Sequence, residues 1–264
     1  MMKRIQKYNT LLKSLRQKIT NRNIYFFWSG GDDSNLLLRI FLHEELNKDC
    51  DLNIIVIPFP QHCYAIDNII SCKEFFAIHK IKVEFLQTEA QIDKNINPAN
   101  ACLLCKSIRR SRFLDYYLPI QQSGDLIITS HNLSDLMSYY IELCTVQLDI
   151  KKRDSYRLRY LEVSNKFLAS YQTENDTELF RPMLTFSQVE IRKFLSLPMC
   201  TNYPLEIILQ KCFWANQRKR LLQDYFVKAD IVSDFNEVYK LMSNDFGVPT
   251  TDEFRTLPFD TYLF

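Results

Sequence analysis

Four short apolar runs alternate with helical patterns along the first half of the chain. The runs lie at 24–28, 52–59, 81–87 and 125–130, and the helical patterns between them lie at 34–47, 64–79 and 101–118. Such alternation predicts parallel strands joined by crossover helices that cover both faces of a sheet. We therefore expect a doubly wound α/β parallel sheet whose ligands bind beyond the carboxyl ends of the strands.

Helical segments are expected on either side of this region. Residues 1–22 have apolar side chains at a helical period and basic side chains opposite them, which predicts an amphipathic helix packed on the body. Contact of its basic face with an RNA backbone is the alternative. The expected parts are an N-terminal helix at 1–22, the α/β domain at 23–200 and a helical C-terminal extension at 201–264.

The second half of the α/β domain is less regular. A charged helical stretch covers 134–172, and a polar loop covers 173–179. Ser187 and Glu190 then have the spacing of a capping box, which predicts that a helix begins at 188.

Composition narrows the class of protein. The 264 residues include 33 basic and 31 acidic side chains, a net charge of +2, with 47% apolar and 24% charged residues. This balance is typical of a globular enzyme and argues against a strongly basic nucleic-acid binder, although it leaves room for a local basic patch. No run approaches the roughly 20 apolar residues of a membrane span, and Met1–Tyr8 is too polar to lead a secretory signal. We expect a cytoplasmic protein without a membrane segment.

Glycine is scarce, yet two of the four glycines, Gly30 and Gly31, are adjacent between the first expected strand and an apolar helix. Paired glycines let backbone amides converge on an anion, and the amino end of the next helix adds further amides. The hydroxyls of Ser29 and Ser34 can donate to phosphate oxygens, and Asp33 suits a magnesium ligand or an anchor for the loop amides. The alternative is a tight turn in which Ser34 caps the helix.

Eight cysteines are present, and only Cys102 and Cys105 are clustered. We expect a helix that starts here with Asn100 as its cap, so that both thiols share one face. The helix dipole and Arg109 would lower the pKa values of these thiols, and two thiolates suit a soft metal or an iron-sulfur cluster. The alternative is a pair of small apolar core residues. Zinc usually needs a second such pair, which the sequence lacks.

The segment WSGGDDS at 28–34 resembles the SGGxDS signature of the PP-loop (N-type) ATP pyrophosphatase superfamily. The resemblance implies an adenine nucleotide alpha hydrolase-like fold, ATP and Mg²⁺ as cofactors, and adenylation of a substrate oxygen, with Asp33 catalytic. The residues it assigns to the ATP are Ser29, Gly30, Gly31, Asp33 and Ser34. Asp32 departs from the pattern of the tRNA-thiolating members, which often have lysine here, and an acid weakens the attraction for phosphate.

The segment CLLCKSIRR at 102–110 is similar to the CxxCxxxRR segment of the iron-sulfur-dependent tRNA 2-thiocytidine and 2-thiouridine synthetases of this superfamily. The resemblance implies that Cys102 and Cys105 are catalytic and hold a 4Fe-4S cluster together with a later cysteine after a proline-containing turn. Cys200 matches that position, and Cys212, in a helix expected from about Pro204, is its competitor. Three ligands would leave one iron open to bind the sulfur to be transferred.

The segment SHNLSD at 130–135 resembles the GHNxDD segment of the same enzymes and follows the fourth expected strand. The resemblance places His131 and Asp135 in the ATP site, and a structural histidine is the alternative. Ser130 and Ser134 depart from the pattern, where glycine and aspartate stand.

The Arg181-Pro182 step resembles the RP step that follows in the family. The resemblance implies that Arg181 faces phosphate or substrate. A cap on a helix, or a pair with an acid, is the equal alternative.

The motifs imply an ATP-dependent sulfurtransferase that adenylates an oxygen, in first place on a tRNA pyrimidine, and replaces it with sulfur from a donor protein or free sulfide. The alternatives are a PP-loop ligase, amidotransferase or sulfurtransferase acting on a small molecule, and a nucleotide-sensing RNA-binding module that has lost catalysis. A homodimer is left open. Basic and aromatic side chains that suit RNA are Lys151, Lys152, Arg153, Tyr156, Arg157, Arg159, Tyr160, Trp214, Arg218, Lys219 and Arg220.

Overall fold

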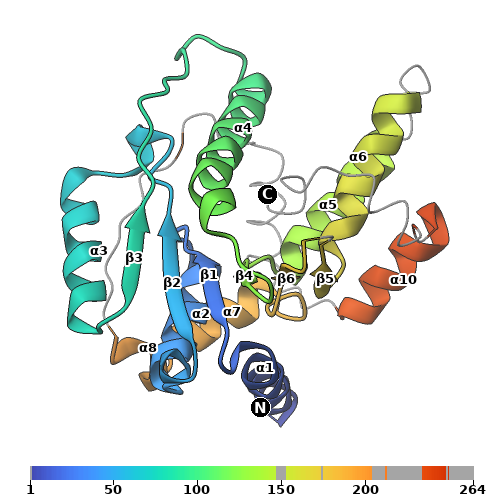
Figure 1. Ribbon diagram of the computed structural model, residues 1–264. Coiled ribbons are helices and arrows are strands. Elements are labelled where there is room, and N and C mark those ends of the chain that lie inside the picture. The colour runs from blue at the N-terminus through green and yellow to red at the C-terminus, as the bar shows by residue number, and fades with distance from the viewer. Residues whose placement is uncertain are drawn as a thin grey trace.

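The computed structural model describes the chain over residues 2–146, 153–173, 175–203, 212, 234–247 and 249. Its centre is a six-stranded sheet with the order β3-β2-β1-β4-β6-β5 (Figure 1). The strands are β1 (Asn23–Phe27), β2 (Asp51–Val56), β3 (Lys82–Phe85), β4 (Leu126–Ile128), β5 (Ser170–Gln172) and β6 (Glu178–Phe180). All neighbours pair in parallel except β5, which runs antiparallel to β6 at the edge. The doubly wound α/β sheet is therefore confirmed.

The helices lie between and beyond these strands (Figure 1). They are α1 (Met2–Ile19), α2 (Asp32–His43), α3 (Ile66–Ile78), α4 (Pro98–Tyr117), α5 (Leu133–Val146), α6 (Arg153–Lys166), α7 (Gln188–Leu195), α8 (Pro198–Thr201) and α10 (Phe235–Phe246). The helix expected from 188 is confirmed with its capping box, in which Ser187 accepts from the Glu190 amide. Asn100 is not a cap, because α4 already begins at Pro98 and contains it. Within the expected helical C-terminal extension at 201–264, residues 204–211, 213–233, 248 and 250–264 lie outside the described residues.

The sheet separates two hydrophobic cores. Along β1 the buried side chains alternate: Ile24 and Phe26 belong to a core with α1, α2, α3, α7 and α8, whereas Tyr25 and Phe27 belong to a core with α4. Successive side chains of a strand point to opposite faces, so these cores lie on opposite sides of the sheet. We call them the α2 face and the α4 face. A third core joins α5, α6 and α10.

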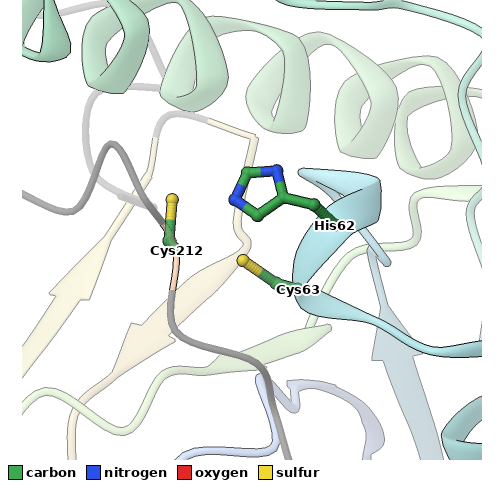
Figure 2. A group of neighbouring side chains, drawn as sticks. All are labelled: His62, Cys63 and Cys212. Carbon is green, nitrogen blue, oxygen red and sulfur yellow. The ribbon is translucent and has the colours of Figure 1, made fainter. Parts of the chain in front are cut away.

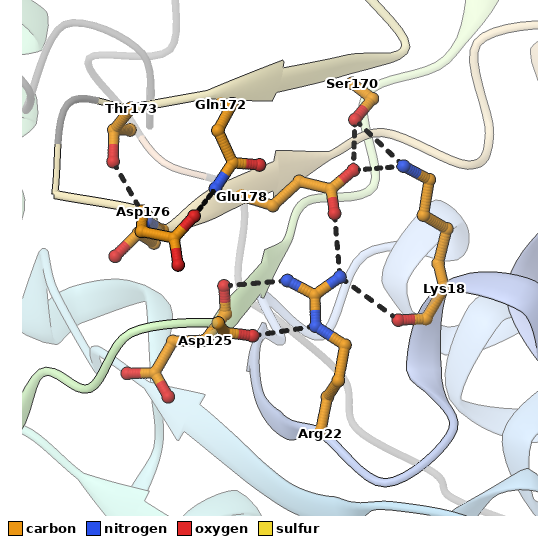
Figure 3. A network of polar contacts seen from close by, with 10 residues as sticks. Lys18, Arg22, Asp125, Ser170, Gln172, Thr173, Asp176 and Glu178 are labelled. Atoms are coloured by element: carbon orange, nitrogen blue, oxygen red, sulfur yellow. Dashed lines mark hydrogen bonds and ion pairs between the residues drawn. The ribbon is translucent and has the colours of Figure 1, made fainter.

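The amphipathic helix α1 is packed on the body, as expected. Leu11, Leu15 and Ile19 are buried in the core of the α2 face. At its carboxyl end, Lys18 and Arg22 form ion pairs with the buried carboxylate of Glu178 on β6 (Figure 3). The N-terminal helix is thus tied to the sheet by apolar packing and by charge.

Candidate functional site

The glycine pair lies at the point where the strand order reverses. Connections from β1 run outward through β2 to β3, whereas β4 adds to the other side of β1. Ligands of open α/β sheets bind at this switch point, beyond the carboxyl ends of the strands. Gly30 has φ of 76°, in the left-handed region, and Gly31 is the N-cap of α2 with extended backbone. The expected anion-binding geometry, a glycine turn that leads into a helix amino end, is therefore present.

Side chains hold this loop from inside. The Ser29 hydroxyl accepts from the Gly31 amide at 3.3 Å, and the fully buried Ser34 hydroxyl donates to the Gly31 carbonyl at 3.1 Å. Asn35, which the sequence gave no reason to single out, donates to the Gly30 carbonyl at 2.9 Å and accepts from the Trp28 ring at 3.0 Å. The two serines and Asn35 thus fix the loop backbone, with the Gly31 amide bonded to Ser29 Oγ.

The acid that departs from the family pattern is neutralised by α7. Asp32 Oδ2 forms an ion pair with Arg192 Nε at 3.1 Å and accepts from Gln188 Nε2 at 3.1 Å. Both groups compensate the carboxylate charge next to the expected phosphate site. The structure therefore offers a physical reason why an acid is tolerated at this position.

The segment after β4 is held by its own helix cap. Asn132 Oδ1 accepts from the Ser134 and Asp135 amides, and Asp135 Oδ2 accepts from the Asn132 amide at 3.1 Å. The buried carboxylate of Asp135 thus helps to hold the start of α5. This structural role differs from the expected place of Asp135 in the ATP site. His131 accepts from or donates to the Thr129 hydroxyl at 3.1 Å.

Gln188 connects the two strand ends. Its Oε1 accepts from Asn132 Nδ2 at 3.1 Å, while its Nε2 donates to Asp32. Its backbone amide donates to the Ser134 hydroxyl at 3.1 Å, so the serine that replaces the family's aspartate has a partner on α7. Sequence reasoning missed Gln188, for which the only signal was its place at the first position of a capped helix.

Arg181 is not at the nucleotide loop. Its side chain is buried, and its guanidinium donates to the carbonyls of Asn165 and Leu168 at 3.1 and 3.0 Å and to Asn165 Oδ1 at 2.8 Å. These carbonyls lie at the carboxyl end of α6, where a cation is favoured. The structure thus corrects the expected contact of Arg181 with phosphate and supports the alternative, a helix cap.

Three cysteines from distant parts of the chain gather on the α4 face. Cys102 and Cys105 of α4 and Cys212 pack against the same core. Cys105 interacts electrostatically with Cys102 and Cys212, and Cys63 interacts with Cys105 and Cys212. The expected shared face of the CxxC pair is confirmed, and Cys63 lies beside Cys212.

Cys200 lies on the other side of the sheet. It is fully buried in the core of the α2 face, on α8, which packs against α2 and α7. The sheet stands between Cys200 and the CxxC pair, so one metal centre cannot reach both. This placement argues against Cys200 as the third ligand, whereas its competitor Cys212, which is not helical, lies on the α4 face with the pair.

Burial decides the protonation of these thiols. It raises the pKa of Cys105 to about 11, although the Arg109 guanidinium lowers it, and burial together with Cys212 raises the pKa of Cys63 to about 12. The lowering expected from the helix dipole and Arg109 is outweighed. A metal that binds here must displace protons from the thiols.

One side chain links the cysteines to the glycine loop. Tyr64, next to Cys63, donates its hydroxyl to the Ser29 carbonyl at 3.3 Å, and it interacts electrostatically with Cys63, Cys105 and Arg109. The loop after β2 therefore lies between the expected ATP site and the cysteines.

Basic side chains lie on α4, the helix of Cys102 and Cys105, and close to it. Lys106 and Arg110 lie on α4, and their charges repel each other and the buried Lys166, whose pKa burial lowers well below its ordinary value. Arg159 is committed to Glu142 and Glu162, at 2.7 and 3.0 Å. The side chains of Lys151, Lys152, Arg153, Tyr156, Arg157, Trp214, Arg218, Lys219 and Arg220 lie outside the described residues.

None of the described helices combines the length and apolar character needed to cross a membrane. No protein-family model and no curated protein matches the chain. A solved structure does, the U34-tRNA thiolase NcsA from Methanococcus maripaludis with its 4Fe-4S cluster. The sequences are 14% identical, the match covers 89% of this chain and 78% of that chain, and the TM-score is 0.62. The chain therefore shares the adenine nucleotide alpha hydrolase-like fold of this thiolase.

Proposed function

We propose that this protein is an ATP-dependent sulfurtransferase that adenylates an oxygen of a tRNA pyrimidine and replaces it with sulfur. The single observation that carries the proposal is the juxtaposition at one sheet edge of a glycine loop and a cysteine group, linked by Tyr64. A phosphate site and a soft-metal site so close together suit activation by ATP followed by sulfur transfer. The structural likeness to a tRNA thiolase supports it.

The residues of the loop have distinct roles in this reaction. The amides of Gly30 and Gly31 and the amino end of α2 would hold the pyrophosphate and neutralise charge as it departs. Asp33, in the first turn of α2, would bind Mg²⁺. Ser29 and Ser34 would keep the amides oriented through the hydrogen bonds described above.

The cysteine group fits the donor set of an iron-sulfur cluster. Cys102, Cys105 and Cys212 supply three thiols on one face of the sheet, and the Arg109 guanidinium partly offsets the effect of burial on the pKa of Cys105. A bound 4Fe-4S cluster would supply an iron without a protein ligand, where sulfide can bind. The eight cysteines form no disulfide, which suits the reducing cytoplasm that we propose as the compartment.

Iron and sulfide content after anaerobic reconstitution tests the ligand set. We expect the wild type and Cys200→Ala to contain the full cluster, and Cys102→Ser, Cys105→Ser and Cys212→Ser to lose most of it. Cys200→Ala is the matched control, because it alters a cysteine of the same chain on the opposite face. Full cluster content in Cys212→Ser, or its loss in a folded Cys200→Ala variant, would overturn the assignment.

The salt dependence of tRNA binding tests whether the substrate is tRNA or a small molecule. Phosphate contacts release counterions, so the affinity for tRNA should fall steeply between low and moderate salt. Changing Lys151, Lys152 and Arg153 to alanine should weaken binding and flatten the salt slope, whereas Arg159→Ala should change them less, because Arg159 is paired with two glutamates. Absence of tRNA binding at low salt would favour a small-molecule substrate.

A further inference from the structure

A second group of metal-binding side chains meets at Cys212. His62 and Cys63 belong to the short turn Gln61–Cys63 that follows β2, and both approach Cys212 (Figure 2). One ligand atom from each of the three residues lies within 4.8 Å of the other two. Within the described part of the chain, no other three histidine, cysteine or acidic side chains come this close.

These distances suit one ion better than one cluster. Ligands of a single tetrahedral zinc ion, bound through sulfur at about 2.3 Å and nitrogen at about 2.0 Å, lie roughly 3.5–3.8 Å apart. The three thiolates of a 4Fe-4S cluster bind three different irons and are spread over the width of the cluster. The group of His62, Cys63 and Cys212 is compact enough for the first arrangement after small side-chain adjustments.

We propose that His62, Cys63 and Cys212 form a site for a single thiophilic divalent ion, Zn²⁺ in the first place. Two sulfur donors and one imidazole match the preference of this ion, and three protein ligands leave the fourth position to water or a small anion. Cys63 is buried while His62 and Cys212 are half-buried, so the site is shielded but reachable. The sequence hint is a His-Cys pair at the carboxyl end of a parallel strand.

The two metal centres share Cys212. The sharing of Cys212 rests on the proposed function, in which Cys212 also holds the cluster. The zinc site itself does not depend on that function. One thiolate cannot serve both centres in full, so zinc and the cluster exclude each other. Zinc loaded before reconstitution would then reduce cluster formation and keep the enzyme inactive.

Zinc titration of the reduced, metal-free full-length chain against a chromophoric chelator tests the site. We expect one tightly bound Zn²⁺ in the wild type, and affinity lower by at least about a hundredfold in Cys63→Ser and in His62→Ala. Cys102→Ser should bind zinc like the wild type, and Cys72→Ser, on α3 in the other core, is the matched control for removal of a buried thiol. Wild-type affinity in a folded Cys63→Ser or His62→Ala variant, or equal loss in Cys102→Ser, would overturn the proposal.

Cluster content separates this proposal from the first. With one equivalent of zinc added before reconstitution, we expect the wild type to incorporate less iron and Cys63→Ser to incorporate its normal amount. If the cluster proposal fails, no variant takes up iron, yet the zinc titration keeps its pattern. If only the zinc site fails, iron uptake is normal and insensitive to zinc.

Discussion

Gly30 and Gly31 are glycines for different reasons. Gly30 has a positive φ of 76°, which an L side chain adopts only with strain. Gly31 has ordinary extended backbone, and a Cβ there would meet only Ser29 Oγ, at 3.4 Å, which is normal contact. The fold therefore needs the first glycine, and the approach of a phosphate would need the second.

Substitution of Gly31 by valine separates binding from folding. We expect the affinity for ATP to fall at least about tenfold, because the side chain fills the space over the loop amides, while the melting temperature changes little. Isothermal titration with ATP and Mg²⁺ measures the first and calorimetry the second. Gly30→Ala is the comparison, with a loss of about 1–2 kcal/mol in folding free energy. Unchanged ATP affinity in Gly31→Val would remove the loop from the nucleotide site.

Substitutions of Asp32 and of its ion-pair partner Arg192 test the electrostatics of the same loop in opposite directions. Removal of the acid in Asp32→Asn should tighten ATP binding by about threefold, and removal of its partner in Arg192→Gln should weaken it by a similar factor, about 0.6 kcal/mol each. The double variant should bind like the wild type, because the effects of removing one negative and one positive charge oppose each other. Equal ATP affinity in all four proteins would mean that Asp32 lies outside the field of the phosphates.

The role of a single residue was predictable from the sequence where an unusual residue type stands at a position with a special backbone geometry. The glycine loop combines a rare residue with a strand-to-helix junction, and its place follows from topology alone. Asp135, Arg181 and Cys200 were assigned by pattern, and the structure gives each a role in packing or capping. A sequence pattern does not show on which side of the sheet a later segment lies. The prediction of Cys200 as a cluster ligand rested on such a pattern, and its place on the α2 face argues against it.

Among the elements, the contact of α1 with β6 concentrates charge in a small space. Glu178 accepts from Arg22 at 2.7 Å and also contacts Lys18 and Ser170 (Figure 3). Although burial raises the pKa of Glu178, the hydrogen bonds from Arg22, Lys18 and Ser170 outweigh it, so the pKa lies below the ordinary value. The carboxylate therefore contributes to folding only while it is ionised.

Replacement of Glu178 by glutamine should lower the free energy of unfolding by about 1–3 kcal/mol at neutral pH, because it leaves partly buried cations without a counter-charge. Since the folded pKa is depressed, the wild-type advantage is full above about pH 4.5 and is lost as the pH falls through the folded pKa. Urea unfolding at several pH values measures it. The control is Glu45→Gln in the exposed pair with Lys48, for which we expect little change. An advantage that stayed constant as the pH was lowered below about 4.5 would contradict this interpretation.

The elements differed in how well the sequence predicted them. β1 and β2 carry five or more residues with strong apolar character, and their positions followed from the sequence within about three residues. β5 and β6 have three residues each and lie in a stretch expected to be helical or a polar loop. So few residues carry no measurable period, and their strand state depends on the pairing of β6 with β4 and of β5 with β6.

At the scale of the whole molecule, the sheet assigns the cysteines to two sides. Cys102, Cys105 and Cys212 share the α4 face with Cys63, and Cys200 belongs to the α2 face. The glycine loop at the switch point between β1 and β4 can reach the first group through the turn that contains Tyr64. ATP activation and sulfur transfer can therefore be adjacent in one molecule, as proposed above.

Mass spectrometry of thionucleosides in tRNA tests directly whether ATP activation and sulfur transfer are coupled in this protein. The anaerobically reconstituted wild type is incubated with unmodified tRNA, ATP, Mg²⁺ and sulfide, and the digested tRNA is quantified beside the AMP released. We predict a thiopyrimidine that accumulates in step with AMP, requires ATP and is absent with Gly31→Val or Cys212→Ser. Cluster-loaded wild-type protein that forms no thionucleoside, or forms it equally without ATP, would contradict the account.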